Sequence, residues 1–409
     1  MDNTQVKKNK RKINFYLLYQ ALAYDWLFFY AIDSIYYADV KHMSFSSISL
    51  LMAILSISYV IIQIPMVRIV RKMRTVTASR IGTFLYLLAA LMLFLGPWAI
   101  YVEQVIFATG MALKNVSDTK ILKDNLKMYG LSENYSKYCG IIKFVYAALA
   151  AVASVAAGLL YEVWVYAPVV ICCGIMFIAF VMSFFITNEK ENYKKANGLP
   201  LHSTPMEKHE YFKLFKFKTT WLLLLFSAIF YAIISCLMDI NKLVFQEFET
   251  FSALTITIVV AITRVVRALT ALGFNMIYKR LKFNSIFIVL AVMIVGVLTI
   301  GLGGLFTSGT TALAIIGIGS SLLYSTRDPF HIVREDFVMN SNGLTKRQSL
   351  LAITNIGCYL GRFICSFTIS GLLLSQSAAT TNLIIIAALA PFAIVLSILL
   401  SRKRKANRY

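Results

Sequence analysis

The sequence predicts an all-α membrane protein with twelve transmembrane helices arranged as two six-helix bundles. Composition is the first observation: of 409 residues, 59% are hydrophobic and 14% are charged, and the mean hydropathy is +0.72. A soluble chain carries about a quarter charged residues, so a soluble globular protein, a disordered chain and a secreted disulfide scaffold are excluded. The other two observations are twelve apolar runs and one long polar segment between the sixth and the seventh.

Each apolar run is long enough for a transmembrane helix, which needs about 20 mostly apolar residues. The first run is too long for a signal peptide and lacks a small-residue cleavage site. The twelve predicted spans lie near 14–38, 46–68, 78–98, 99–122, 138–160, 164–187, 219–245, 252–278, 284–306, 311–333, 348–373 and 381–401.

The polar segment 188–218 differs from the tight turns elsewhere in the chain. It carries seven lysines and contains Gly198, Pro200 and Pro205. We therefore expect a linker at 188–218, an N-terminal six-helix bundle over 1–187 and a C-terminal six-helix bundle over 219–409.

The distribution of Lys and Arg predicts the orientation of the chain. Alternate connections carry 32 of these residues, whereas the opposite set of loops carries one, Lys41. Cytoplasmic loops are the ones enriched in Lys and Arg, so we expect both termini and the linker to be cytoplasmic, in the cytoplasmic membrane of the cell. The net charge of +21 then reflects this bias and attraction to anionic lipid headgroups, not nucleic-acid binding.

The two halves also resemble each other at an offset of 206 to 213 residues, in constant order, which indicates a duplication. The matched positions are Asp33 with Asp239, Phe45-Ser46 with Phe251-Ser252, the basic turns at 71–74 and 279–282, 123–126 with 334–337, Tyr146 with Tyr359, and Gly158 with Gly371.

Two parallel six-helix halves joined by a cytoplasmic linker resemble the major facilitator superfamily over the whole length of this chain. The resemblance implies a substrate site near the midplane between the halves, exposed alternately as one half rocks against the other. The family motif Gly-x-Leu-Ala-Asp-Arg-x-Gly-Arg-Lys corresponds here to residues 64–74, where the Ile-Pro and the basic turn remain. Val67, Arg71 and Arg74 replace its first Gly, its Asp and its second Gly.

In the family that Asp helps to lock the cytoplasmic gate, so the resemblance implies that the lock here uses other residues or is weaker. The Gly-Pro-Gly-Gly pattern of drug/proton antiporters is also missing from span five, which reads Ala-Ala-Leu-Ala-Ala-Val-Ala-Ser-Val-Ala-Ala-Gly over 147–158. The subfamily is not identified by these residues.

Charged residues inside the spans are the candidates for function. A charge at the bilayer centre costs about 2.5–3.5 kcal/mol on insertion scales, so these side chains must face water or one another. The basic ones are Lys114, Lys143, Lys242, Arg264, Arg267, Arg327 and Arg362. The acidic ones are Asp25, Asp33, Asp118, Asp239 and Asp328.

Three arginines near the midplane predict an anion-binding centre. Arg264 and Arg267 are three residues apart and share a helix face, and Arg362 lies at a similar depth. The guanidinium fork binds carboxylate or phosphate in a bidentate manner and keeps its proton. We predict that these arginines bind the substrate. The alternative is a structural network in which Arg267 or Arg362 pairs with Asp25 or Asp239.

Asp25 is the candidate proton-coupling residue, because a carboxyl group in an apolar wall takes up protons more readily. The alternative is a simple ion pair, and the repeat counterpart of Asp25 is Tyr231, so the position is not symmetric. Tyr24 and Tyr30 of the same span are candidates to stack on an aromatic or amphipathic substrate, whereas tyrosines near the ends of the span are interfacial anchors.

The remaining buried charges are candidates for gating. The outer group consists of Asp33, Asp239 and Lys242, and the inner group of Lys114, Asp118, Lys143, Arg327, Asp328 and His331. Pro329 removes a helical hydrogen bond just after Asp328, so we expect span ten to kink or unwind there.

These features predict a secondary active transporter that moves a small organic solute, anionic or amphipathic, by alternating access with proton coupling. The runner-up is a multidrug or lipophile exporter. The chain has no GxxxxGK[ST] loop for ATP-driven transport. We expect no enzyme activity, cofactor, metal or nucleic-acid partner, but a monomer that contacts membrane lipids, a small-molecule substrate and, as the candidate coupling ion, protons. A receptor or scaffold is the alternative from another class.

Overall fold

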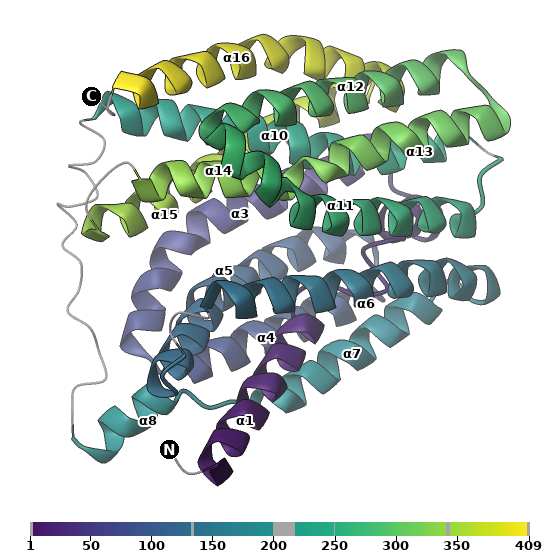
Figure 1. Ribbon diagram of the computed structural model, residues 1–409. Coiled ribbons are helices and arrows are strands. Elements are labelled where there is room, and N and C mark those ends of the chain that lie inside the picture. The colour runs from purple at the N-terminus through teal and green to yellow at the C-terminus, as the bar shows by residue number, and fades with distance from the viewer. Residues whose placement is uncertain (1–2, 132–134, 199–216, 249, 341–343, 407–409) are drawn as a thin grey trace. The chain divides into compact units, whose positions relative to one another are not determined.

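The computed structural model describes residues 3–131, 135–198, 217–248, 250–340 and 344–406. These residues form helices joined by turns, and no strand occurs among them (Figure 1). The chain divides into two compact units: unit 1 consists of Met1–Asp33 and Ser58–Pro205, and unit 2 of Ser34–Ile57 and Met206–Tyr409. The division passes through α3 (Phe45–Lys72), which contributes residues to both units. The bundle limits expected from the linker remain a prediction.

Unit 1 contains five long helices and the short α8 in addition to its part of α3. Pro97 stands at the first position of α5, where its missing N–H is not needed. The helices are α1 (Asn3–Leu22), α4 (Thr75–Met92), α5 (Pro97–Met128), α6 (Tyr135–Val163), α7 (Ala167–Ser183) and α8 (Glu189–Ala196).

Unit 2 contains the second set of long helices. Ser252 caps α11, since its hydroxyl accepts the Thr255 N–H at 3.3 Å. The helices are α10 (Lys218–Gln246), α11 (Ala253–Leu281), α12 (Ser285–Phe306), α13 (Gly309–Ser325), α14 (Arg327–Asn340), α15 (Leu344–Leu372) and α16 (Ala378–Ala406). The short 3₁₀ helix η3 (Lys282–Asn284) precedes α12, and the π-helix η1 (Tyr36–Val40) follows α2 (Asp33–Ile35), which begins at the boundary between the units.

Two of the predicted spans are interrupted in the structure. Span ten breaks at Thr326, between α13 and α14, which places Pro329 in the first turn of α14, where proline is tolerated. The helix is therefore interrupted beside Pro329, as expected. Span one, predicted as a continuous run over 14–38, ends as a helix at Leu22 and resumes at Asp33. The segment between includes Phe28 in a left-handed conformation with φ of 71°, which an α-helix cannot contain.

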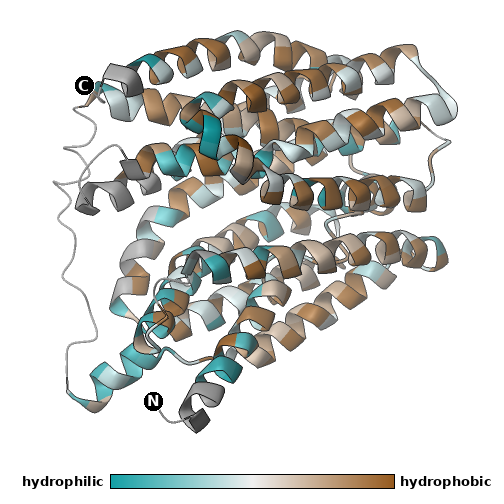
Figure 2. Cartoon of the chain, viewed as in Figure 1, coloured by the Kyte–Doolittle hydropathy of each residue, from teal (hydrophilic) through white to brown (hydrophobic). Residues whose placement is uncertain are grey.

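Six stretches of the described residues are long and apolar enough to cross a membrane by length and composition. Hydrophobic residues cover most of the long helices, whereas hydrophilic residues gather on α8 (Figure 2). The six stretches are Phe45–Gln63, Thr75–Met92, Lys137–Val163, Lys218–Gln246, Ala253–Phe306 and Ala378–Arg402. The described part of the chain is thus all-helical with membrane-spanning helices, as predicted, while the count of twelve remains a prediction.

Helix α8, which lies in the predicted linker, is joined to α4 within unit 1. Asn188 caps α8 by accepting the Glu191 N–H at 3.1 Å, and its amide donates to the Thr75 hydroxyl at 2.9 Å. The Glu191 carboxylate accepts the Thr75 N–H at 3.1 Å and its hydroxyl at 2.8 Å. A carboxylate at the first residue of α4 satisfies N–H groups that have no partner inside the helix. The beginning of the predicted linker is therefore anchored to unit 1.

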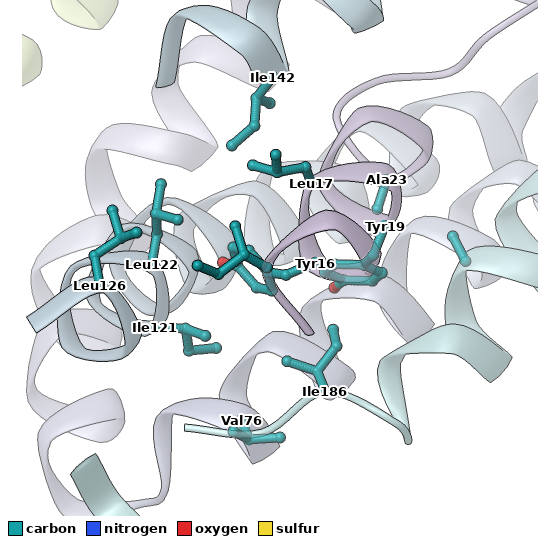
Figure 3. Close-up of a cluster of buried hydrophobic side chains, with 12 residues drawn as sticks. Tyr16, Leu17, Tyr19, Ala23, Val76, Ile121, Leu122, Leu126, Ile142 and Ile186 are labelled. Carbon is teal, nitrogen blue, oxygen red and sulfur yellow. The ribbon is translucent and has the colours of Figure 1, made fainter. Parts of the chain in front are cut away.

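A cluster of buried apolar side chains fills the same part of unit 1. Residues from α1, α4, α5, α6 and the segment after α7 surround Tyr16 and Tyr19 (Figure 3). Tyr16 is 4% exposed and Tyr19 is fully buried, so both hydroxyl groups need partners inside the protein. These partners belong to the charged network described below.

In unit 2, α10 and α15 pack with their backbones close together. Gly357 and Gly361 form a GxxxG pattern on α15, which allows such an approach in membrane helices. A Cβ atom at Gly361 would overlap the carbonyl group of Ala228, and one at Gly357 would lie 3.1 Å from the carbonyl oxygen of Leu224. This contact fixes the position of Arg362, the next residue of α15, beside α10.

We expect Gly361→Ala to lower the free energy of unfolding in detergent micelles by about 1–3 kcal/mol, because the new methyl group has no space. Gly371→Ala on the same helix is the matched control. A Cβ atom at Gly371 meets nothing within 4 Å, although the chemical change is the same. Equal stability of the two variants would show that α10 and α15 do not approach this closely.

Candidate functional site

The predicted substrate residue Arg362 forms an ion pair inside unit 2. Its Nη2 donates to Oδ2 of Asp239 on α10 at 2.7 Å and lies 3.4 Å from Sδ of Met52 on α3. The Arg362 side chain is 11% exposed and that of Asp239 is 21% exposed. The Nε atom of Arg362 is buried and has no hydrogen-bond partner among the described residues. The site therefore combines a neutralised guanidinium with one unused N–H donor.

Arg267 on α11 forms a second ion pair in unit 2, with Asp328 in the first turn of α14. Its Nε donates to Oδ2 at 2.7 Å and its Nη2 to Oδ1 at 2.9 Å, a bidentate arrangement. The side chains are 25% and 19% exposed, so the pair is only partly buried. The break before α14 puts Asp328 at a helix start, where a carboxylate also interacts favourably with the helix dipole.

The neighbouring candidates Arg264, Arg327 and His331 are partly buried in unit 2. Arg264 lies one turn before Arg267 on α11, and Arg327 and His331 lie on α14. The His331 ring is 5.9 Å from the ring of Tyr231, edge to face. All three have interaction partners in the structure. The structure thus brings predicted substrate and gating residues together on α11 and α14.

In unit 1, Asp25 lies in the interruption between α1 and α2. Its Oδ1 accepts the Trp26 N–H at 2.8 Å, and its Oδ2 accepts the Tyr146 hydroxyl of α6 at 3.1 Å. The Tyr24 ring lies 4.4 Å from the Tyr146 ring, and Tyr24 remains 45% exposed. The carboxylate that we predict as the proton site therefore bonds with neutral donors rather than with an arginine of its own unit.

Lys114 and Asp118 of α5, both predicted as gate residues, form an ion pair of 2.9 Å within unit 1. Ser79 of α4 donates to Asp118 at 2.5 Å, and Lys114 donates to the Tyr19 hydroxyl of α1 at 3.1 Å. Lys114 is 5% exposed and Asp118 is 8% exposed. The Tyr16 hydroxyl donates to the backbone carbonyl of Asp118 at 2.8 Å. This network joins α1, α4 and α5 by buried polar contacts.

The other predicted residues lie at separate places. Asp33 and Lys242 are buried and have partners, Tyr30 is partly buried and has partners, and Lys143 is exposed on α6. The prediction that these residues act in substrate binding or gating stays a prediction.

Glu103 is a buried charged residue of α5 that sequence reasoning missed. It is fully buried, although it lies only a few residues inside the predicted span 99–122. An acidic residue so near the end of a span is expected at the membrane–water interface. For this reason Glu103 was not counted among the buried charges. The neighbouring Gln104 is the available signal, because two adjacent polar residues within an apolar run indicate a buried contact.

The comparison with known families decides the classification. A model of the Major Facilitator Superfamily matches residues 17–329. The chain belongs to the Major Facilitator Superfamily. The resemblance found in the sequence is thereby confirmed, and this member of the superfamily is a multi-pass membrane transporter for a small-molecule substrate rather than an enzyme.

Solved structures of superfamily transporters share its fold. A single-residue mutant of the nucleoside transporter NupG superimposes with a TM-score of 0.75 at 14% identity, over 96% of this chain and 99% of that chain. NupG itself gives 0.71 at 16% identity, over 96% and 98%. A bacterial homologue of the iron transporter ferroportin, in the inward-facing state, gives 0.64 at 14% identity, over 98% and 100%. No curated protein sequence matches the chain significantly.

Proposed function

We propose that this superfamily member is a secondary active transporter for a small organic solute that is anionic or amphipathic. The observation that carries the proposal is Arg362, a mostly buried guanidinium that holds Asp239 and keeps its Nε donor unused. An anionic group of the solute can take that donor or replace Asp239, because arginine binds carboxylates and phosphates in a bidentate manner. Arg264 and Arg267 are proposed to contribute to the same binding, and Tyr24 and Tyr30 to stack on the solute.

The solute crosses by alternating access. Its transport is driven by protons that bind to Asp25 and leave it. We further propose twelve spans in two six-helix bundles, over 1–187 and 219–409, in a monomer that contacts membrane lipids. The termini and the linker 188–218 are cytoplasmic in this proposal, which rests on the asymmetry of Lys and Arg between the two sets of loops. Asp33, Asp239, Lys242, Lys114, Asp118, Lys143, Arg327, Asp328 and His331 are the proposed gate residues.

Export of drugs or other lipophilic compounds is the second candidate function. It is favoured by the two ion pairs, since Asp239 and Asp328 neutralise two of the three arginines that would attract an anion. A site whose positive charge is largely neutralised suits an uncharged lipophile better than three unpaired guanidinium groups would.

Ligand screening by thermal shift separates the two candidates, because a compound that binds the folded state raises its melting temperature. We expect stabilisation by organic anions such as carboxylates and phosphate esters, and loss of that shift in the Arg264→Gln/Arg267→Gln variant. Arg280→Gln, at the exposed end of α11, is the matched control and should keep the shift. Stabilisation by lipophilic antibiotics alone would favour the exporter instead. Flux of the best compound into proteoliposomes then tests transport.

The role of Asp25 gives a separate prediction. Asp25→Asn should retain exchange of the screened compound across proteoliposomes but lose its accumulation under a pH gradient, because the amide cannot bind and release a proton. Tyr146→Phe, which removes one donor to the carboxylate, should change the pH dependence without abolishing accumulation. An unchanged pH response in Asp25→Asn would exclude this residue from coupling.

A further inference from the structure

Glu103 stands apart from the other acidic residues of unit 1. Its side chain is fully buried, and the adjacent Gln104 is 4% exposed. Oε2 of Glu103 accepts the Gln104 amide at 2.8 Å, whereas Oε1 is buried and has no hydrogen-bond partner among the described residues. None of the ion pairs formed by the described residues includes Glu103.

Two other carboxyl groups of unit 1 have interaction partners that Glu103 lacks. Asp118 is also buried, but Lys114 lies 2.9 Å away and Ser79 donates a hydrogen bond. Asp25 is only partly buried and receives two hydrogen bonds. Glu103 combines complete burial with one neutral donor. A carboxylate in that position would carry an uncompensated charge, and such a group becomes neutral instead.

No basic side chain of the described residues forms an ion pair with Glu103. On α4, Gly82 and Tyr86 lie against Gly110 of α5, and the antiparallel course brings the later part of α4 beside Glu103. Between Gly82 and the end of α4, Tyr86 is the titratable residue. Its ring stacks on the ring of Phe107, with 4.5 Å between the ring centroids. The other titratable side chains on neighbouring elements are Tyr24, Asp25 and Tyr30 in the segment before α2, Tyr161 and Glu162 at the end of α6, and Cys172 and Cys173 on α7. None of these forms a hydrogen bond or ion pair with Glu103.

We propose that Glu103 is a proton-binding site, distinct from Asp25, which is occupied when α5 is packed as in this structure and empties only when water reaches it. The proton is the ligand that this site can accept, since it removes the charge without needing space. Only the use of this proton for transport rests on the proton coupling proposed above.

Infrared difference spectroscopy of the purified full-length protein tests the occupancy directly. We expect the spectrum of wild type minus Glu103→Gln at neutral pH to show the loss of one carbonyl stretch of a protonated carboxylic acid, which shifts in D2O. Glu162→Gln, an exposed glutamate on α6, is the matched control and should show only the loss of carboxylate bands. Loss of carboxylate bands in Glu103→Gln would overturn the proposal.

A second variant keeps Glu103 in place and covers the case in which Glu103→Gln does not fold. Gln104→Leu removes the amide that donates to Oε2. The carboxylic acid band should then move to higher frequency, because its carbonyl group loses a hydrogen bond, and no movement would contradict the assignment. If the band is present but transport does not respond to a pH gradient, proton coupling fails while the proton site stands.

Discussion

Arg362→Gln should remove ligand-dependent stabilisation and also lower the free energy of unfolding by about 2–3 kcal/mol, since it leaves Asp239 without its partner in a mostly buried site. This loss of stability is smaller than for a fully buried ion pair, because the Asp239 side chain is 21% exposed. Stability is measured by denaturation in detergent micelles, and binding by the thermal shift with the compound selected in the screen.

The double variant Arg362→Gln/Asp239→Asn separates binding from stability. Neutralising both partners removes the unpaired carboxylate, so most of the lost stability should return. The thermal shift should not return, because neither amide supplies the guanidinium donors that an anion needs. A double variant that binds the compound as wild type would show that the pair only holds α10 and α15 together. Arg402→Gln, an exposed arginine near the end of α16, is the control for general loss of positive charge.

Most of the fold could be predicted because it depends on hydrophobic length. The apolar runs correspond to helices, and Pro329 indicated the break before α14, since a proline in the first turn of a helix costs no backbone hydrogen bond. The interruption after α1 could not be predicted. It coincides with the left-handed Phe28 and with the Asp25 side chain, which takes a backbone N–H that a helix would use, and hydrophobic length carries no information about either.

The charged residues of the candidate site could be predicted, but their pairing could not. Asp239 with Arg362 was one of the alternatives considered from sequence, whereas Asp328 with Arg267 was not. Counting residues along helices placed Arg267 near the midplane and Asp328 in the inner third. The depth of a residue estimated in this way is accurate to about one helical turn. The side chains of Arg267 and Asp328 are long enough to bridge the remaining difference in depth. Glu103 was missed because its depth placed it at the membrane interface, and depth in a span does not state which face of a helix is buried.

The ion pair of Lys114 and Asp118 gives the largest expected effect in unit 1. Lys114→Met should lower the free energy of unfolding by about 3–5 kcal/mol, because Asp118 is 8% exposed and would have to keep a charge without a cation or bind a proton in its place. Ser79 would still donate to Asp118, but one hydroxyl does not compensate a buried carboxylate. Lys143→Met, an exposed lysine on α6, should change stability by less than about 0.5 kcal/mol.

Lys114→Met/Asp118→Asn then distinguishes a structural pair from a gate. The asparagine can still accept the Ser79 hydroxyl, so we expect the double variant to regain most of the stability lost in Lys114→Met. If the pair serves only to hold α1, α4 and α5 together, flux through proteoliposomes should recover in proportion to stability. If the pair is a gate, flux should stay altered in a stable protein, because the charge that favours one conformation over the other is gone. A double variant that remains as unstable as Lys114→Met would contradict the ion pair itself.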